Sequence, residues 1–252
     1  MIEIFILSFV QGITEFIPVS SSSHLIIISK FLNFTYNNLL VDVSLHIGSF
    51  LAIIFYFKND FHILIKNKKI FIFLLTASLP VIFFGWILVE FAIIEHLRNL
   101  KIIGWTTFLF GILLLISDRC KTKKKMYSNL SLYSALLIGF FQILSLVPGV
   151  SRSGITITAA RFLEFNRVDA AKISFLISIP TLAALMMYGF YSLYNANNLI
   201  FSKISLLSVF LSFIFSYIII KYFLLFLKKF SLTIFVFYRA ILGLIILIYA
   251  YF

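Results

Sequence analysis

ISLLSVFLSFIFSYIIIKYFLLFL, residues 204–227, decides the fold class, because it is an apolar stretch long enough to cross a membrane. A helix needs about 20 apolar residues to span the roughly 30 Å hydrocarbon core of a bilayer. Similar stretches recur along the whole chain, at residues 41–57, 70–91, 102–117, 130–147, 173–194 and 232–252. Helices are the default spanning element because each satisfies its own backbone hydrogen bonds in lipid. The sequence therefore predicts an all-α, polytopic integral membrane protein.

The composition leads to the same class. Of the 252 residues, 62% are hydrophobic and 12% are charged, and no soluble fold could bury that share of apolar side chains. Residues 2–19 resemble a signal peptide in hydropathy, but they lack a basic start, contain Glu3 and Glu15, and precede no small-residue cleavage site. We therefore expect them to belong to the mature protein.

The net charge of +12 does not indicate a nucleic-acid partner. The basic residues gather in short loops between apolar stretches, whereas nucleic-acid-binding proteins place them on an amphipathic or aromatic-interleaved face. Topogenic charge is the better interpretation, so we expect the bilayer as a partner and no nucleic acid. Cys120 is the only cysteine, which excludes a disulfide within the chain and a cysteine metal site.

Positively charged loops stay on the cytoplasmic side of a membrane. The two most basic loops contain Lys66 and Lys123, and a third basic turn holds Lys228 and Lys229. We therefore predict that these three turns face the cytoplasm. Asn197, which lies in an uncharged loop, and both chain termini should then face the outside.

Counting the crossings between these loops leaves two stretches that must enter and leave the membrane on the same side. Residues 130–166 start and end on the cytoplasmic side, and the sequence Pro-Gly-Val-Ser-Arg-Ser-Gly at 148–154 breaks them in the middle. Residues 1–33 start and end outside and are broken at 18–24. Proline interrupts a helix, and irregular backbone is tolerated at membrane depth where protein buries it. We therefore predict two re-entrant helical hairpins.

The two breaks resemble each other. A shift of 131 positions (142 − 11) places Gln11 on Gln142, and the Val-Ser-Ser-Ser run at 19–22 on the Val-Ser-Arg-Ser run at 150–153. Because the two hairpins enter from opposite sides, this similarity predicts an inverted repeat, in which broken helices meet near the midplane at a shared polar site. We expect a single membrane domain over residues 1–252, with halves at about 1–117 and 130–252.

The first break combines the side chains of a hydrolytic site. Gln11 and Glu15 lie one helical turn apart, serines follow at the break, and His24 comes shortly after them. Carboxylate, hydroxyl and imidazole are the parts of a nucleophile, base and metal site. An ionisable group inside a membrane segment is costly, so Glu15 indicates function. Serines alone are weaker evidence, since they also pack or cap helices.

The second break carries Arg152 in a turn rich in glycine and serine, before a helix expected from Ile155. Backbone N–H groups at a helix start, hydroxyls and a guanidinium fork are suited to holding phosphate. The alternative is that Arg152 only extends to the membrane interface. Its coincidence with the Glu-Ser-His break in the repeat favours phosphate binding.

Further polar residues lie inside apolar stretches, where lipid would disfavour them. Asp42 and His46 are four positions apart and could pair with each other. Arg239 lies within the last stretch and needs an anionic partner or a wet cavity, which a phosphate pocket would supply.

At these residues the chain resembles the undecaprenyl pyrophosphate phosphatase family of bacterial membranes, whose members are often called bacitracin resistance proteins. Gln11-x-x-x-Glu15, the following Phe-Ile-Pro-Val-Ser-Ser and His24 resemble the first signature of that family, and Pro-Gly-Val-Ser-Arg-Ser-Gly-x-Thr, ending at Thr156, resembles the second. Further matches are Asp42-x-x-x-His46-x-Gly48-Ser, Arg167 with Ser174-Phe-Leu-x-x-x-Pro180, and Tyr238-Arg239. The resemblance therefore covers essentially the full chain.

The sequence departs from the family pattern at a few positions. Gln11 stands where many members carry glutamate, which leaves fewer carboxylates for a metal. Ser23 replaces the common glycine before the histidine. Arg161 and Glu164 take the place of small or apolar residues, and we expect them either to pair locally or to face the inner interface.

The resemblance implies hydrolysis of undecaprenyl pyrophosphate, a C55 polyprenyl lipid, to the monophosphate, which recycles the lipid carrier of peptidoglycan synthesis and gives bacitracin resistance. It also implies a divalent cation, Mg²⁺ or Ca²⁺, held through Glu15, and a place in the bacterial cytoplasmic membrane with the site open to the periplasm. A polyprenyl-phosphate flippase or a secondary transporter is the alternative, because inverted repeats with broken helices are the usual build of transporters. The oligomeric state stays open, a homodimer included.

Pyrophosphate hydrolysis requires a nucleophile and groups that neutralise the charge spreading over the phosphoryl oxygens. We expect Glu15, Ser21, His24 and Arg152 to be the catalytic residues. Either Ser21 attacks with His24 as its base, which we favour, or His24 itself accepts the phosphoryl group. The residues expected to bind the substrate are Gln11, Ser20, Ser151, Ser153, Gly154 and Arg239.

Overall fold

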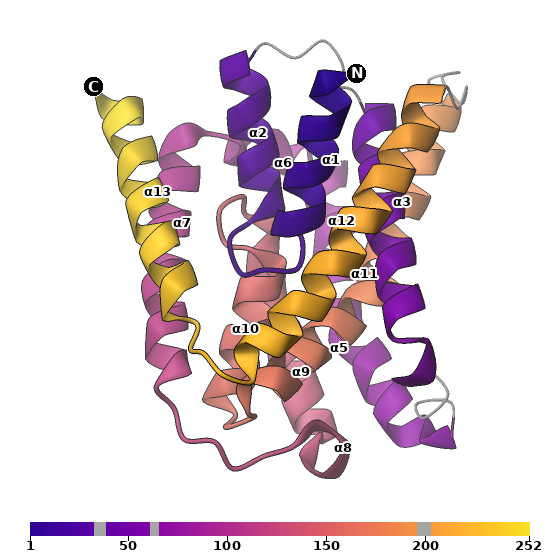
Figure 1. Ribbon diagram of the computed structural model, residues 1–252, viewed down its shortest axis with the longest axis vertical. Coiled ribbons are helices and arrows are strands. Elements are labelled where there is room, and N and C mark those ends of the chain that lie inside the picture. The colour runs from indigo at the N-terminus through magenta and orange to yellow at the C-terminus, as the bar shows by residue number, and fades with distance from the viewer. Residues whose placement is uncertain (33–38, 61–65, 196–202) are drawn as a thin grey trace.

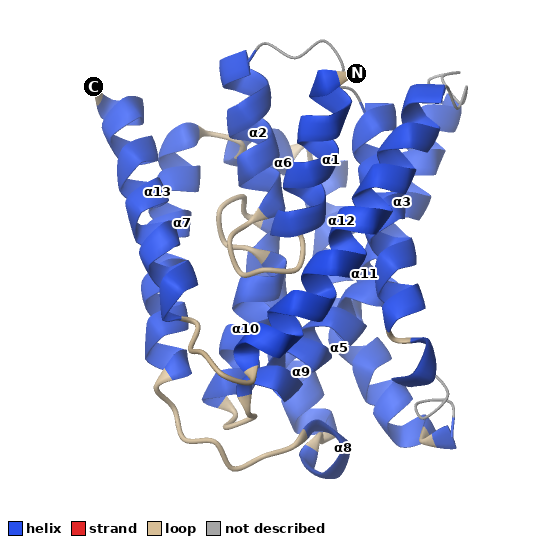
Figure 2. Ribbon diagram, viewed as in Figure 1, coloured by secondary structure: helices blue, strands red, loops and turns tan. Residues whose placement is uncertain are grey.

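The computed structural model describes residues 1–32, 39–60, 66–195 and 203–252, which form an all-α protein (Figure 2). Its helices are α1 (Ile2–Thr14), α2 (Ser21–Leu32), α3 (Leu39–Tyr56), α5 (Lys68–Glu90), α6 (Ile93–Leu97), α7 (Leu100–Asp118), α8 (Met126–Asn129), α9 (Leu132–Ile143), the 3-10 turn η1 (Leu144–Leu146), α10 (Arg152–Phe162), α11 (Arg167–Asn195), α12 (Lys203–Leu227) and α13 (Thr233–Tyr251). Within these described ranges, α3, α5, α7, α11, α12 and α13 are long and apolar enough to cross a membrane. The predicted all-α, polytopic membrane fold is thereby confirmed.

One predicted apolar stretch does not become a spanning helix. Residues 130–147 contain α9, which has 12 residues, and the short turn η1. At a rise of about 1.5 Å per residue, α9 is only about 18 Å long, which is too short for a bilayer core of about 30 Å. This stretch therefore contains no helix long enough to span the core.

Two pairs of short helices form hairpins whose connecting loops lie in the interior. Residues 15–20 connect α1 to α2, and residues 147–151 connect η1 to α10. Figure 1 shows α1 and α2 at the end that carries both chain termini, and α8 at the opposite end, with both connecting loops near the middle. Each predicted break therefore lies at a hairpin loop. The re-entrant placement in a bilayer and the inverted repeat over whole halves stay predictions, and Asn197 lies outside the described residues.

The loops share an unusual backbone conformation at matched positions. Ser20 has φ of 77° and Ser151 has φ of 72°, and the shift of 131 positions that aligns Gln11 with Gln142 also aligns these two serines. A left-handed conformation is uncommon for a residue other than glycine and is found mostly at turns or functional sites. Each serine directly precedes a helix, α2 or α10. The local similarity of the two breaks therefore extends from sequence to backbone geometry.

Small residues let α12 approach its neighbours closely. Buried serines recur along one face of α12, and Ser212 and Ser216 lie 3.2 and 3.0 Å from the hydroxyl of Ser49 on α3. The Ser212 hydroxyl also donates to the Leu45 carbonyl at 2.7 Å. Small and hydroxyl-bearing residues are typical of helix contacts in membranes, where they allow close packing and interhelical hydrogen bonds. These contacts hold α3 beside α12.

The apolar side chains divide between a core and an outer surface. Phe16, Phe57 and Phe175 are fully buried and pack edge to face around the first loop, α3 and α11. Many other large apolar side chains point outward, among them Trp86 and Phe237. An outer surface of this kind is suited to contact with lipid.

A buried polar cluster fixes the C-terminal end of α10. Arg161 is 1% exposed and donates to the carbonyl oxygens of Asp118, Cys120 and Phe165. The Asp118 carboxylate also accepts two hydrogen bonds from Arg167, at 2.6 and 3.1 Å.

The expected local pair between Arg161 and Glu164 is therefore wrong. Arg161 instead turns inward, and its Nε lies 3.9 Å from the Asp118 carboxylate. The side chain of Glu164 forms its ion pair with Lys123, at 3.4 Å. The alternative expectation was that Arg161 faces the inner interface, and the structure shows this arrangement.

Candidate active site

The two hairpin loops contact each other in the interior. Arg152, the first residue of α10, donates from Nη2 to Oε1 of Glu15 at 2.7 Å. The Ser153 hydroxyl donates to the Ile17 carbonyl at 2.9 Å. Residues from the two halves of the chain therefore form one polar site.

Glu15 is the centre of this site. It follows the last turn of α1, is 7% exposed, and accepts hydrogen bonds on both carboxylate oxygens. Oε1 accepts from Arg152, while Oε2 accepts from Gln11 Nε2 at 3.0 Å and from the Ser21 hydroxyl at 2.7 Å. A buried carboxylate is stable only where it is paired and hydrogen-bonded, and these three donors meet that requirement.

Two buried atoms beside Glu15 lack a hydrogen-bond partner within the described part of the chain. They are Oε1 of Gln11, which can only accept, and Nη1 of Arg152, which can only donate. A buried polar group without a partner costs about 1–3 kcal/mol, and more when it is charged. An unpaired acceptor and an unpaired cationic donor in one site are complementary to a ligand that carries both a cation and an anion.

Ser21 and His24 do not contact each other as the favoured interpretation expected. The Ser21 hydroxyl bonds Glu15, whereas both ring nitrogens of His24 have other partners. Nδ1 lies 2.6 Å from the Ser20 carbonyl oxygen, and Nε2 lies 2.5 Å from the hydroxyl of Tyr238 on α13. The structure therefore offers Glu15, rather than His24, as the acceptor for the Ser21 proton.

The second loop organises its own polar groups. The Gly154 N–H donates to the Ser151 hydroxyl at 3.1 Å, and the hydroxyls of Ser151 and Ser153 lie 3.2 Å apart. Gly149 has φ of +96°, and a Cβ there would collide with the Thr106 hydroxyl and the Ile103 carbonyl. Only glycine combines this backbone with so close an approach to α7. The loop is therefore held against α7, with Ser153 and Arg152 directed at the first loop.

Arg239 lies at the site, and its hydrogen-bond partners are backbone carbonyl oxygens. It is 0% exposed, and it donates from Nε to the Thr107 carbonyl at 3.1 Å. Nη1 donates to the Pro18 carbonyl at 3.2 Å and Nη2 to the Gly149 carbonyl at 2.9 Å. Arg239 therefore connects α7, the first loop and the second loop, which corrects the expectation that it needs an anion or a wet cavity. Its expected role in binding substrate stays a prediction.

The remaining sequence candidates have partners of their own. Ser20 directs its hydroxyl to Ser23, at 3.0 Å, so the serine that replaces the common glycine has a partner within the loop. His46 Nδ1 bonds the backbone carbonyl of Asp42, at 2.8 Å. Gln142, the counterpart of Gln11, donates to Thr181 at 3.2 Å.

Sequence reasoning missed the place of Tyr238 in the site. This residue lies 214 positions from His24, and its ring stacks on the imidazole with 5.7 Å between ring centroids and 10° between planes. The only signal in the sequence was the Tyr238-Arg239 match to the family pattern.

The oxygen atoms available beside Glu15 are compatible with a divalent cation. Gln11 Oε1 is a buried carbonyl oxygen without a partner among the described residues, and Glu15 supplies a carboxylate. The described ranges contain no group of three His, Cys, Asp or Glu side chains that could hold a metal. Mg²⁺ commonly binds through one or two carboxylates together with substrate phosphates and water, so these residues fit a cation that arrives with a phosphate ligand.

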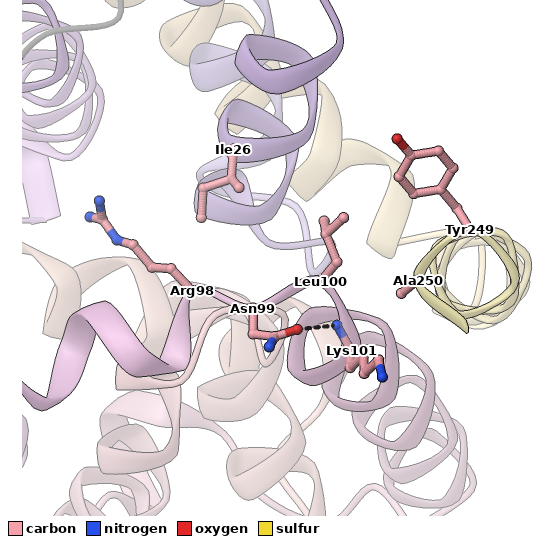
Figure 3. Close-up of a pocket in the computed structure, with 7 residues that line it drawn as sticks. All are labelled: Ile26, Arg98, Asn99, Leu100, Lys101, Tyr249 and Ala250. Carbon is pink, nitrogen blue, oxygen red and sulfur yellow. Dashed lines mark hydrogen bonds between the residues drawn. The ribbon is translucent and has the colours of Figure 1, made fainter. Parts of the chain in front are cut away.

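A cavity of about 420 Å³ opens at the end of the molecule that carries the termini (Figure 3). It lies between α2, the start of α7 and the end of α13, and its lining residues are Ile26, Arg98, Asn99, Leu100, Lys101, Tyr249 and Ala250. None of the residues around Glu15 lines it. The cavity is thus separate from the polar centre, although α2 and α13 contribute to both.

Comparison with known proteins identifies the family. The family model described as "Bacitracin resistance protein BacA" matches residues 4–245. The chain belongs to this family. An undecaprenyl-diphosphatase of Pelagibacter ubique is 48% identical to it over 254 residues, covering 100% of this chain and 98% of the relative. The undecaprenyl-diphosphatase of Saccharophagus degradans is 40% identical over 249 residues, with 94% and 93% covered.

Proposed function

We propose that this BacA-family protein hydrolyses undecaprenyl pyrophosphate to undecaprenyl phosphate and inorganic phosphate. Full-length relatives that carry the name undecaprenyl-diphosphatase support this assignment. The observation that carries it is the site around Glu15, where a serine hydroxyl bonds a buried carboxylate and one buried Arg152 donor has no partner among the described residues. A nucleophile, its proton acceptor and an anion-binding fork are what phosphoryl transfer requires.

In the proposed reaction, Ser21 is the nucleophile. Its oxygen attacks the terminal phosphorus, its proton passes to the Glu15 carboxylate 2.7 Å away, and the bond to the bridging oxygen breaks to release undecaprenyl phosphate. A water molecule then hydrolyses the phosphoserine and regenerates Ser21. We favour Ser21 over His24 because both nitrogens of His24 are already engaged.

Arg152 is proposed to bind the phosphoryl group that is transferred. Nη2 bonds Glu15, and Nη1 is buried beside it and ready to donate. Ser20, Ser151 and Ser153 supply hydroxyls near the two loops, within reach of further phosphate oxygens. A fork of fixed N–H donors suits the developing charge of the transition state better than a mobile ammonium would.

A divalent cation, Mg²⁺ or Ca²⁺, is part of the proposal. Bound beside Glu15 and Gln11, it would neutralise charge on the pyrophosphate. Because Gln11 stands where many family members carry glutamate, Glu15 is the one carboxylate of the Gln11 and Glu15 pair.

We further propose that the protein lies in the bacterial cytoplasmic membrane, that its site opens to the periplasm, and that it contributes to bacitracin resistance by recycling the carrier lipid. The positions of the basic segments support this orientation. α8, which follows the basic loop, lies at the end opposite the termini (Figure 1), and basic loops stay cytoplasmic.

Release of phosphate by the purified protein in detergent tests the proposal. Undecaprenyl pyrophosphate would be supplied with and without EDTA, and Ser21→Ala would serve as the matched inactive variant. We expect phosphate release that depends on added Mg²⁺ or Ca²⁺ and is lost in Ser21→Ala. A flippase or transporter needs a sealed membrane, so a protein that releases no phosphate in detergent but moves the lipid across vesicles would refute the hydrolase assignment.

A further inference from the structure

The His24 ring is held from two sides by groups of different chemistry. Nδ1 faces the Ser20 carbonyl oxygen at 2.6 Å, and Nε2 faces the Tyr238 hydroxyl at 2.5 Å. The first partner comes from the loop that precedes α2, whereas the second comes from α13, at the other end of the chain. The stacked arrangement of the two rings supports the second contact.

These contacts define which ring nitrogen carries the hydrogen. A carbonyl oxygen can only accept, so Nδ1 must donate and therefore carries a hydrogen. In the neutral ring, Nε2 is then the acceptor, and the hydroxyl of Tyr238 donates to it. If Nε2 takes up a proton, the bond reverses, Nε2–H donates to the tyrosine oxygen, and the hydroxyl hydrogen becomes free to bond another acceptor. The ring can thus change its charge without losing either partner.

Tyr238 is delivered to His24 by a well-fixed element. Its neighbour Arg239 bonds the Pro18 carbonyl in the first loop and the Gly149 carbonyl in the second. Since these bonds fix α13 against both loops, the Tyr238 hydroxyl has a defined position although the residue is 44% exposed. The ring of Tyr249, further along α13, contacts Phe31 of α2 at 5.0 Å between centroids and involves no histidine. The chain thus offers a comparison between two aromatic contacts of the same helix pair.

We propose that Tyr238 is a positioning residue of the active site, which acts through His24. Its hydroxyl fixes the ring orientation and keeps Nε2 as the nitrogen that accepts a proton. This inference rests on the proposed hydrolase function, in which Glu15 takes the Ser21 proton. It adds a separate proton-accepting role for His24, which follows Ser21 by three residues on α2. Partners that orient a metal-binding histidine contribute about ten- to a hundred-fold to affinity or activity, and we expect the lower end of that range for a histidine that binds no metal.

The test is Tyr238→Phe, which removes the hydroxyl and keeps the ring, with Tyr249→Phe as the matched control. We expect Tyr238→Phe to lower kcat about ten-fold, with KM and thermal stability close to those of the parent, while Tyr249→Phe retains full kcat. Added to His24→Asn, the Tyr238→Phe change should have no further effect, because a residue that acts through another cannot lower activity once that residue is gone. Equal kcat in the two tyrosine variants, or a full ten-fold loss in the His24→Asn background, would overturn the inference.

A spectroscopic measurement separates this inference from the proposed function. In protein labelled with ¹⁵N-histidine, the His24 signals are identified by their loss in His24→Asn. The parent should show hydrogen on Nδ1, and the Nε2 signal should move in Tyr238→Phe but not in Tyr249→Phe. Absence of phosphate release by the parent would refute the hydrolase proposal and leave this readout intact, whereas an unmoved Nε2 signal would refute the contact itself.

Discussion

Arg239→Lys tests whether the C-terminal helix holds the two loops together. The parent guanidinium reaches three carbonyl oxygens on three segments, those of Thr107, Pro18 and Gly149. A lysine keeps the positive charge, but its single ammonium cannot reach three acceptors that surround a planar fork. We expect one carbonyl to keep a partner and two to lose theirs.

The cost follows from those two lost bonds. A hydrogen bond from a charged group contributes about 1.5–3 kcal/mol, so two of them amount to about 3–6 kcal/mol. For a protein of this length, about 1 kcal/mol corresponds to roughly 2–4 °C in the unfolding midpoint. Arg239→Lys should therefore lower the Tm by at least about 6 °C, and activity should fall with it because both loops carry site residues.

Thermal unfolding in one detergent, followed by tryptophan fluorescence, measures this effect alongside phosphate release. Arg152→Lys is the matched control, because it makes the same exchange in an arginine that faces the site instead of the backbone. A Tm within about 2 °C of the parent in Arg239→Lys, combined with lost activity, would refute the reasoning. It would indicate that Arg239 acts on the substrate, as the sequence alone suggested.

Further predictions concern the site and the orientation. Arg152→Lys should lower kcat by about a hundred- to a thousand-fold, the usual cost of losing one preorganised donor, while its Tm stays near that of the parent; near-normal turnover at saturating substrate and metal would remove Arg152 from the site. Glu15→Gln should abolish cation-dependent phosphate release in a protein that still elutes as a folded species, and substantial turnover would contradict both proposed roles of Glu15. After Cys120 is replaced by serine, a cysteine at position 2 should react with an impermeant thiol reagent from the periplasm and a cysteine at position 123 should not; the reverse pattern would invert the topology.

The fold could be predicted from sequence because the bilayer imposes a strong constraint. A spanning helix must be apolar over about 20 residues, so α5, α7 and α12 were visible as stretches whose limits differ from the observed ones by only a few positions. The hairpins were visible for a different reason. Proline at 18 and at 148 breaks an otherwise apolar helix. The basic loops also required each broken stretch to start and end on the same side of the membrane.

The contact between the two breaks was also predictable, but the detailed contacts within the polar site were not. Glu15 and Arg152 come together because the two breaks do, and both are charges that lipid would not tolerate alone. The partner of Ser21 depends on loop geometry, since a serine six positions after a glutamate and three before a histidine can face either. The sequence favoured His24, and the backbone turn at Ser20 directs the hydroxyl to Glu15 instead.

Arg161 and Arg239 could not be assigned for a related physical reason. Their main partners are backbone carbonyl oxygens. Every residue has a carbonyl, and in a helix most are already bonded. Only the folded chain reveals which carbonyls are left free, so an arginine that binds them looks in the sequence like one that binds a ligand.

The carbonyls at the two breaks explain how irregular backbone can persist inside this protein. Loops at membrane depth are tolerated only where other protein groups satisfy their polar atoms. In the first loop the Ile17 and Pro18 carbonyls accept from Ser153 and Arg239.

In the second loop the matching acceptors are the carbonyls of Pro148 and Gly149, which are bonded by Thr106, at 2.6 Å, and by Arg239. The donors come from α7, α10 and α13, so helices distant in sequence stabilise the turns that present Glu15, Ser21 and Arg152. Because Arg239 bonds one carbonyl in each loop, it couples the two halves of the site directly. The site residues are therefore preorganised by groups that need not touch the substrate, and a variant at Arg239 should disturb both loops together.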